Sequence, residues 1–168
     1  MNAFLKALQQ PEYVHTLLNP IPIYGLVVGV IALIAALFWR NVSVQKAALV
    51  IVFLASLSVW PVMLFGGKAK ERIIPMTADA DGEAWLSAHE QRADNVVWVY
   101  YTTAALSLAA LVLPRFYPKA RMPLVMLTAL LGCGALVAGS YIAYAGGRIR
   151  HREFRLEPPP SQSPDREG

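Results

Sequence analysis

Three histidines, His15, His89 and His151, are the residues of this chain with the clearest capacity for chemistry. Imidazole nitrogens are common ligands of haem iron and of first-row transition metals. The histidines lie near uncharged apolar runs, at the entrance of the first, ahead of the third and just past the fourth. No C-x-x-C-H haem-attachment motif or H-E-x-x-H zinc motif accompanies them. They are therefore candidate ligands for a non-covalently bound haem or a metal ion or, alternatively, interfacial side chains without a ligand role.

Other residue patterns do not predict catalysis. The "DADGE" stretch invites comparison with a calcium loop, but Gly82 at the sixth position would place Thr77 first and Ala88 twelfth, where carboxylates are required. A helix cap explains these acidic residues better. The sequence also lacks a phosphate-binding G-x-x-x-x-G-K-[ST] loop and a G-x-S-x-G nucleophile motif. We therefore predict no catalytic residues and favour a protein that is not an enzyme.

The composition indicates that these histidines are positioned by membrane helices. Hydrophobic residues make up 56% of the 168 residues and charged residues only 15%, and the mean hydropathy is +0.43. An apolar helix of about 20 residues is long enough to cross the hydrocarbon core of a bilayer. Four runs without Asp, Glu, Lys, Arg or His meet that length and predict four spans, at about 21–39, 47–65, 96–113 and 122–147.

The predicted fold is an all-α, integral membrane four-helix bundle with up-down-up-down topology, because short links join the first two and the last two spans. The stretch "MNAFLKALQQ" predicts an interfacial N-terminal helix that ends before Pro11. The third helix is expected to begin near Gly82 and to continue into its span. Residues 1–155 would form the membrane domain and 156–168 a disordered tail. This topology places all three histidines on one side of the membrane.

Small residues predict how the helices pack. Lipid is as apolar as a leucine side chain, so close backbone approach is needed to hold membrane helices together. The candidate packing glycines are Gly25, Gly29, Gly132, Gly139 and Gly146. Their faces could lie inside the bundle or form a contact between two copies. The single cysteine, Cys133, cannot form an intrachain disulfide and is expected to be a buried apolar filler.

The basic stretch after the fourth span has two interpretations. Its arginines Arg148, Arg150 and Arg152 are predicted to anchor the helix end at the depth of the lipid phosphates. Alternatively, His151 is the centre of a site, with Tyr144 and Glu153 beside it. The net charge of +4 is explained by basic segments at a lipid surface, and we predict no nucleic-acid partner.

Four motifs, in this order, cover nearly the whole chain before the tail: "LLNPIPIYG", "FGGKAKERI", "AHEQRAD" and "AGGRIRH". They resemble the uncharacterised bacterial family of four-span membrane proteins called domain of unknown function 2231. Members often carry a His-Pro before the first helix and a further His before the double glycine, where this chain has Asn19 and Tyr144. The resemblance implies the four-span architecture and residence in the bacterial inner membrane as a multi-pass protein, and it implies no reaction.

Two functions follow from these patterns. The first is a non-catalytic subunit or scaffold of a membrane assembly, with no cofactor, whose partners are the lipid bilayer and a membrane protein or a second copy of this chain. The alternative is a small membrane redox protein that binds haem b or quinone at one membrane face through His89 and His151, together with His15. An absorption spectrum distinguishes the two functions.

Overall fold

The computed structural model describes residues 2–77 and 79–160, and every regular element in those ranges is a helix. In chain order the α-helices are α1 (Ala3–Ala7), α2 (Pro11–Leu18), α3 (Pro20–Phe38), α4 (Val42–Leu57), α5 (Val59–Ile73), α6 (Ala80–Val112) and α7 (Arg121–Arg148). Four short 3-10 helices accompany them: η1 (Ile74–Met76), η2 (Leu113–Arg115), η3 (Pro118–Ala120) and η4 (Arg152–Phe154).

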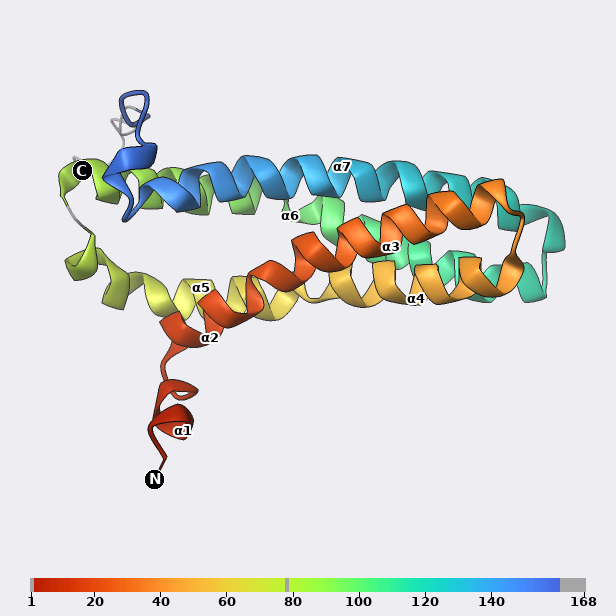
Figure 1. Cartoon of the computed structure of the whole chain (residues 1–168), viewed down its shortest axis with the longest axis horizontal. Helices are drawn as coiled ribbons and strands as arrows, with labels where there is room; N and C mark the ends of the chain where they lie inside the picture. Colours follow the sequence, from red (N-terminus) through yellow and green to blue (C-terminus); the bar gives the residue numbers. More distant parts are fainter. Residues whose placement is uncertain (1, 78, 161–168) are drawn as a thin grey trace.

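Four helical stretches in these ranges are long and apolar enough to cross a membrane: Pro11–Phe38, Val42–Ile73, Ala80–Arg115 and Pro118–Arg148. They lie side by side in an elongated bundle (Figure 1). The short links between α3 and α4 and between α6 and α7 lie at one end. The connection between α5 and α6 and the segment after α7 lie at the other end, and α1 projects away from the side of the bundle nearer that end (Figure 1). The chain therefore has the helices of a multi-pass membrane protein, as its apolar runs predict.

Prolines divide the first two of these stretches. Pro20 and Pro22 have no N–H to donate to the preceding turn, and α2 gives way to α3 at Asn19. Pro61 likewise leaves the carbonyl of Leu57 without its helical donor, and α4 gives way to α5 at Ser58. The run 47–65, predicted as a single span, lies within the one apolar stretch Val42–Ile73, in which α4 gives way to α5.

The third stretch is a single helix, as predicted. Asp79 caps α6, because its side chain accepts a 2.9 Å hydrogen bond from the backbone N–H of Gly82. From Ala80 the helix continues without interruption to Val112, so it begins two residues before the predicted Gly82. His89 thus lies on the same rigid helix as the apolar span.

Small residues allow close contacts between the helices. A Cβ on Gly25 would lie 2.7 Å from the Cβ of Ala55, and a Cβ on Gly132 would lie 2.6 Å from a methyl group of Val30. Gly25 and Gly132 therefore lie where α3 meets α4 and α7, respectively. Cys133, next to Gly132, was expected to be buried but is exposed, because successive residues on a helix point in different directions.

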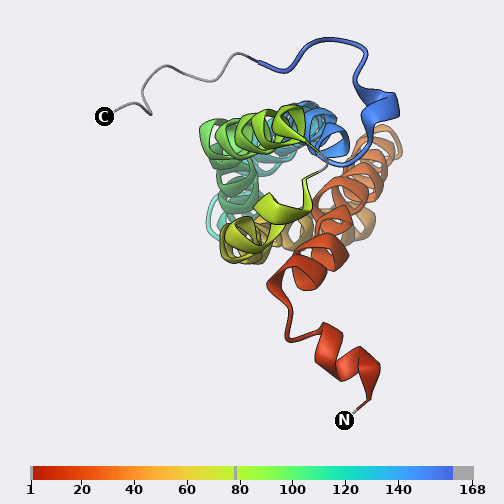
Figure 2. The ribbon, with the colours of Figure 1, turned by 90° about the vertical axis from the view of Figure 1, so that its left-hand side faces the viewer.

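The burial pattern of α3 and α4–α5 recurs in α6 and α7. Buried residues at matching positions of α3 and α6 are Leu26 and Tyr100, Val30 and Ala104, Leu33 and Ser107, and Ala36 and Ala110. Those of α4–α5 and α7 are Leu49 and Ala129, Val52 and Gly132, Ala55 and Ala135, and Val59 and Gly139. We call α2–α5 the first half and α6–α7 with η4 the second half. The two halves therefore bury the same helix faces. Figure 2 shows the long helices of the two halves side by side in one bundle.

Candidate functional site

A cavity of about 670 Å³ lies between α2, α5, α6 and α7, at the end of the bundle that carries the connection between α5 and α6. Its volume is in the range of small-molecule and cofactor sites. The lining combines apolar residues with polar and charged ones, and all three histidines contribute to it. The structure therefore brings His15, His89 and His151 to one cavity, but it does not place them in equivalent surroundings.

His15 is held between α2 and α5. Its Nδ1 lies 2.9 Å from the backbone carbonyl oxygen of Val62. One helical turn later, Gly66 provides the space that the imidazole occupies, since a Cβ on Gly66 would lie 3.0 Å from both Nδ1 and Cε1 of the ring. The carbonyl and the missing side chain together fix the position of this ring.

His89 is held between α6 and α7 in the same way. Its Nδ1 lies 3.0 Å from the carbonyl oxygen of Ile142, and a Cβ on Gly146, one turn later, would lie 3.0 Å from Nδ1 and 3.1 Å from Cε1. His15 and His89 occupy matching positions in the two halves. The site thus follows the same repeat as the burial pattern.

These hydrogen bonds determine which nitrogen of each ring is available. A carbonyl oxygen only accepts hydrogen bonds, so in the neutral form of either ring Nδ1 carries the proton and Nε2 presents a lone pair. Within residues 2–77 and 79–160, neither Nε2 has a hydrogen-bond partner. Histidines that ligate metals typically donate their other N–H to a carbonyl or carboxylate, which orients the ring and makes the ligating nitrogen more basic.

His151 is different. Its ring stacks on Phe154 with the centroids 4.9 Å apart, and its Nδ1 lies 2.8 Å from a carboxylate oxygen of Glu153. The side chain is 57% exposed. The sequence paired His89 with His151, whereas His15 is the histidine whose geometry matches that of His89.

The three predicted lipid anchors lie in three environments. Arg148 is buried, with its guanidinium carbon 3.4 Å from the ring centroid of Tyr144 and its Nη1 donating to the Tyr144 carbonyl oxygen. Arg150 is exposed and lines the cavity. Arg152 is exposed and forms a 2.9 Å ion pair with Asp79. Contact with lipid phosphate stays a prediction for Arg150 and Arg152, while Arg148 packs within the protein.

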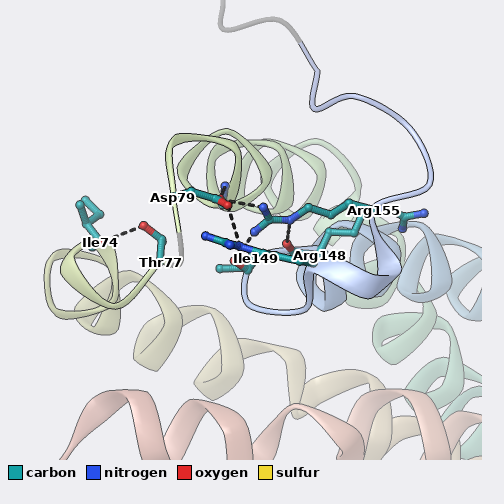
Figure 3. A network of polar contacts seen from close by, with 8 residues as sticks. Ile74, Thr77, Asp79, Arg148, Ile149 and Arg155 are labelled. Carbon is teal, nitrogen blue, oxygen red and sulfur yellow. Dashed lines mark hydrogen bonds and ion pairs between the residues drawn. The ribbon is translucent and has the colours of Figure 1, made fainter.

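Asp79 also joins the segment after α7 to the start of α6 (Figure 3). Arg155 donates from Nη1 to Asp79 at 2.7 Å, from Nε to the carbonyl oxygen of Arg148 and from Nη2 to that of Ile149. The backbone N–H of Gly82 and then the Arg155 guanidinium hold the pKa of Asp79 below its ordinary value of 3.8. The sequence indicated Asp79 only as a helix cap, because the position of Arg155 depends on how the chain turns after α7.

A basic motif after each double glycine repeats the same arrangement. Residues 66–72 read "GGKAKER" and residues 146–152 read "GGRIRHR", which share the pattern G-G-[KR]-x-[KR]-x-R. The final arginine pairs with an acid of the same half in both cases, Arg72 with Glu12 at 3.0 Å and Arg152 with Asp79. Both segments are visible in the sequence, and comparing them would have revealed the repeat.

Among the described residues there is no group of three or more His, Cys, Asp or Glu side chains able to hold a metal ion. Two imidazoles nevertheless suit a group that brings its other metal ligands with it, as the porphyrin of haem does. The fold and the site define a helical, multi-pass membrane type of protein with a cavity that contains paired histidines. No family model, curated protein or solved structure matches the chain.

Proposed function

We propose that this protein is a membrane redox protein that holds a b-type haem between His15 and His89. The observation that carries the proposal is the equivalence of the two rings: both line one cavity, and each has its Nδ1 at a carbonyl oxygen and its edge against a glycine. If haem were bound, His15 and His89 would be the residues that hold its iron, and no ligand position would then remain for a substrate. Electron transfer is therefore the activity that suits this ligand set.

Haem is favoured over quinone by the direction of the hydrogen bonds. With Nδ1 donating to a carbonyl, Nε2 of a neutral histidine can only accept a proton or bind a metal. The carbonyl oxygens of an oxidised quinone are also acceptors, so they find no donor at either Nε2. A single metal ion is disfavoured as well, since a structural or catalytic zinc site uses three or four protein ligands.

In the proposed arrangement the four long helical stretches cross the membrane up-down-up-down, and α1 lies at the lipid interface. The cavity then lies at the membrane face on which the chain ends lie. Membership of the family named domain of unknown function 2231, and residence in the bacterial inner membrane, are part of this proposal. A scaffold or subunit role is the alternative, and the redox role is compatible with assembly into a larger membrane complex.

The absorption spectrum of protein purified in detergent and supplied with haem tests the proposal. We expect a Soret band and the sharp reduced-state bands of six-coordinate haem. His15→Ala and His89→Ala should each abolish the six-coordinate spectrum, because each removes one axial ligand. His151→Ala is the matched control and should retain it.

A wild-type protein that takes up no haem would overturn the redox proposal and leave the scaffold role. If His151→Ala lost the six-coordinate spectrum and His15→Ala kept it, the ligands would be His89 and His151, the pair that the sequence favoured.

A further inference from the structure

The repeat places a second pair of equivalent residues on the cavity, one turn beyond the glycines that contact the histidines. These are Lys70, after Gly66, and Arg150, after Gly146. Both line the cavity. Lys70 lies on α5 four residues after Gly66, and residues four apart on a helix share a face. Arg150 lies two residues past the end of α7, so the turn that follows the helix places it on the cavity. The first half therefore contributes His15 and Lys70 to the cavity, and the second half contributes Arg150 together with His89 and His151.

The neighbouring basic residues of the motif do not share this location. Lys68 lies over the ring of Phe65, with its Nζ 5.7 Å from the ring centroid, and Arg148 is buried against Tyr144. Neither residue lines the cavity. The location is thus specific to the position four residues after the glycine, and Lys68 provides a control on the same helix.

Lys70 has a protein partner that a ligand could replace. Its Nζ lies 2.7 Å from a carboxylate oxygen of Glu90, and both side chains are about one third exposed, at 35% and 38%. An ion pair at this exposure is weak, so a competing carboxylate can replace it. Arg150 is exposed, and no ion-pair partner for it lies among the described residues.

Acidic residues also line the cavity, and they bear on which ligand charge is accepted. Glu12 is paired with Arg72, and Glu90 is paired with Lys70, whereas Asp94 is exposed and has no ion pair among the described residues. A dianionic ligand is therefore received by the two repeated cations and repelled by Asp94 and Glu90. Removing one of these acids should therefore raise the affinity for a dianionic ligand, whereas removing a cation should lower it.

We propose, on the basis of the haem assignment above, that the ligand of this cavity carries two carboxylates and that Lys70 and Arg150 each receive one. Free haem has this chemistry, with two propionates on one edge of its ring and the iron at its centre. A quinone has no carboxylate and an esterified porphyrin has none that is charged.

The test compares ferric protoporphyrin with its dimethyl ester, titrated into the full-length protein in detergent and followed by the Soret band. The ester keeps the ring and the iron and removes both negative charges. Lys70→Gln with Arg150→Gln should weaken binding of the free diacid about fivefold for each cation removed, and should leave the affinity for the ester unchanged. Lys68→Gln should change neither affinity.

Glu90→Gln should change the affinity for the diacid in the opposite direction, because it removes the ion-pair partner of Lys70 and a negative charge. It should strengthen binding of the diacid about two- to fivefold and leave the ester unaffected. Equal losses for diacid and ester in the double variant, or no loss for the diacid, would overturn the proposal. The histidine variants separate the two levels of inference: if His15→Ala and His89→Ala bind both porphyrins as the wild type does, the haem assignment itself fails.

Discussion

At the scale of single residues, the two glycines beside the histidines are as important to the site as the histidines. Gly66 and Gly146 lie where any side chain would meet an imidazole ring. Gly67, the next residue, has nothing within 4 Å of the position of its Cβ. The first glycine of each pair therefore leaves room for an imidazole, whereas Gly67 lines the cavity without contacting His15.

Gly66→Ala and Gly146→Ala should each displace the adjacent histidine by a few tenths of an ångström and weaken haem binding. Overpacking of this kind costs about 1–3 kcal/mol, which is partly offset by the higher helix propensity of alanine, worth about 1 kcal/mol. Haem titration measures the affinity and thermal unfolding in detergent measures the stability. Gly134→Ala is the control, because a Cβ there would meet nothing within 4 Å and the residue does not line the cavity. A loss of haem binding in Gly134→Ala equal to that in Gly66→Ala would contradict this account.

The contacts of Asp79 predict an acid-dependent stability. Because its pKa in the folded protein lies below the ordinary value of 3.8, the stabilisation by its ionised form is complete above that value and is lost as the pH falls through the folded-state pKa. Asp79→Asn keeps a good helix cap but removes the charge that pairs with Arg152 and Arg155.

The midpoint temperature of unfolding, measured from neutral pH down to about pH 2, tests this prediction. The wild type should be the more stable protein at neutral pH, and the difference from Asp79→Asn should shrink in acid. A difference that stays constant over the whole range would show that the ion pairs with Arg152 and Arg155 do not contribute to stability.

The candidate residues of the site were visible in the sequence, but their pairing was not. All three histidines were identified from their type and from their place at the ends of apolar runs. The choice of His15 over His151 depends on the carbonyl of Val62, and on how η4 directs His151 toward Glu153. Such contacts are tertiary, so residue type and spacing alone do not predict them.

At the scale of elements, glycines determine how closely neighbouring helices approach. In α7, a Cβ on Gly132 would meet a methyl group of Val30, whereas a Cβ on Gly134 would meet nothing within 4 Å. Gly132→Ala should therefore lower the free energy of unfolding by about 1–3 kcal/mol, and Gly134→Ala should leave it equal or slightly higher. Thermal unfolding in detergent compares the two variants, and equal stabilities would show that α3 can move aside without cost.

The elements themselves were largely predictable. Membrane helices need long runs without charge, and such runs stand out in a sequence whatever their packing. The start of α6 was predicted to within two residues because acidic capping residues precede it. The predicted run 47–65 lies within the one stretch Val42–Ile73, and the break at Ser58 was not predicted, since prolines are often accommodated within membrane helices. Of the tail predicted at 156–168, the part after residue 160 lies outside the described residues.

At the scale of the whole molecule, the proposed membrane topology can be measured with single cysteines. In a Cys133→Ala background, Asn41→Cys reports on the link between α3 and α4, and Asp81→Cys reports on the start of α6; both positions are exposed. Gly82 is unsuitable, because a Cβ there would lie 2.7 Å from the carbonyl oxygen of Ile149. A membrane-impermeant maleimide should label the two cysteines from opposite compartments. Labelling of both from one compartment would contradict the up-down-up-down topology.

The ion pairs near this end of the bundle bear on whether the two halves must follow one another in their present order along the sequence. Arg72 and Glu12 belong to the first half, and Arg155 and Asp79 belong to the second. Cutting the chain near η1 would leave both ion pairs in place, because each joins two residues of the same half. A circularly permuted chain, with the second half placed before the first, would therefore contain the same ion pairs within each half. The order of the two halves along the chain is not what these ion pairs depend on.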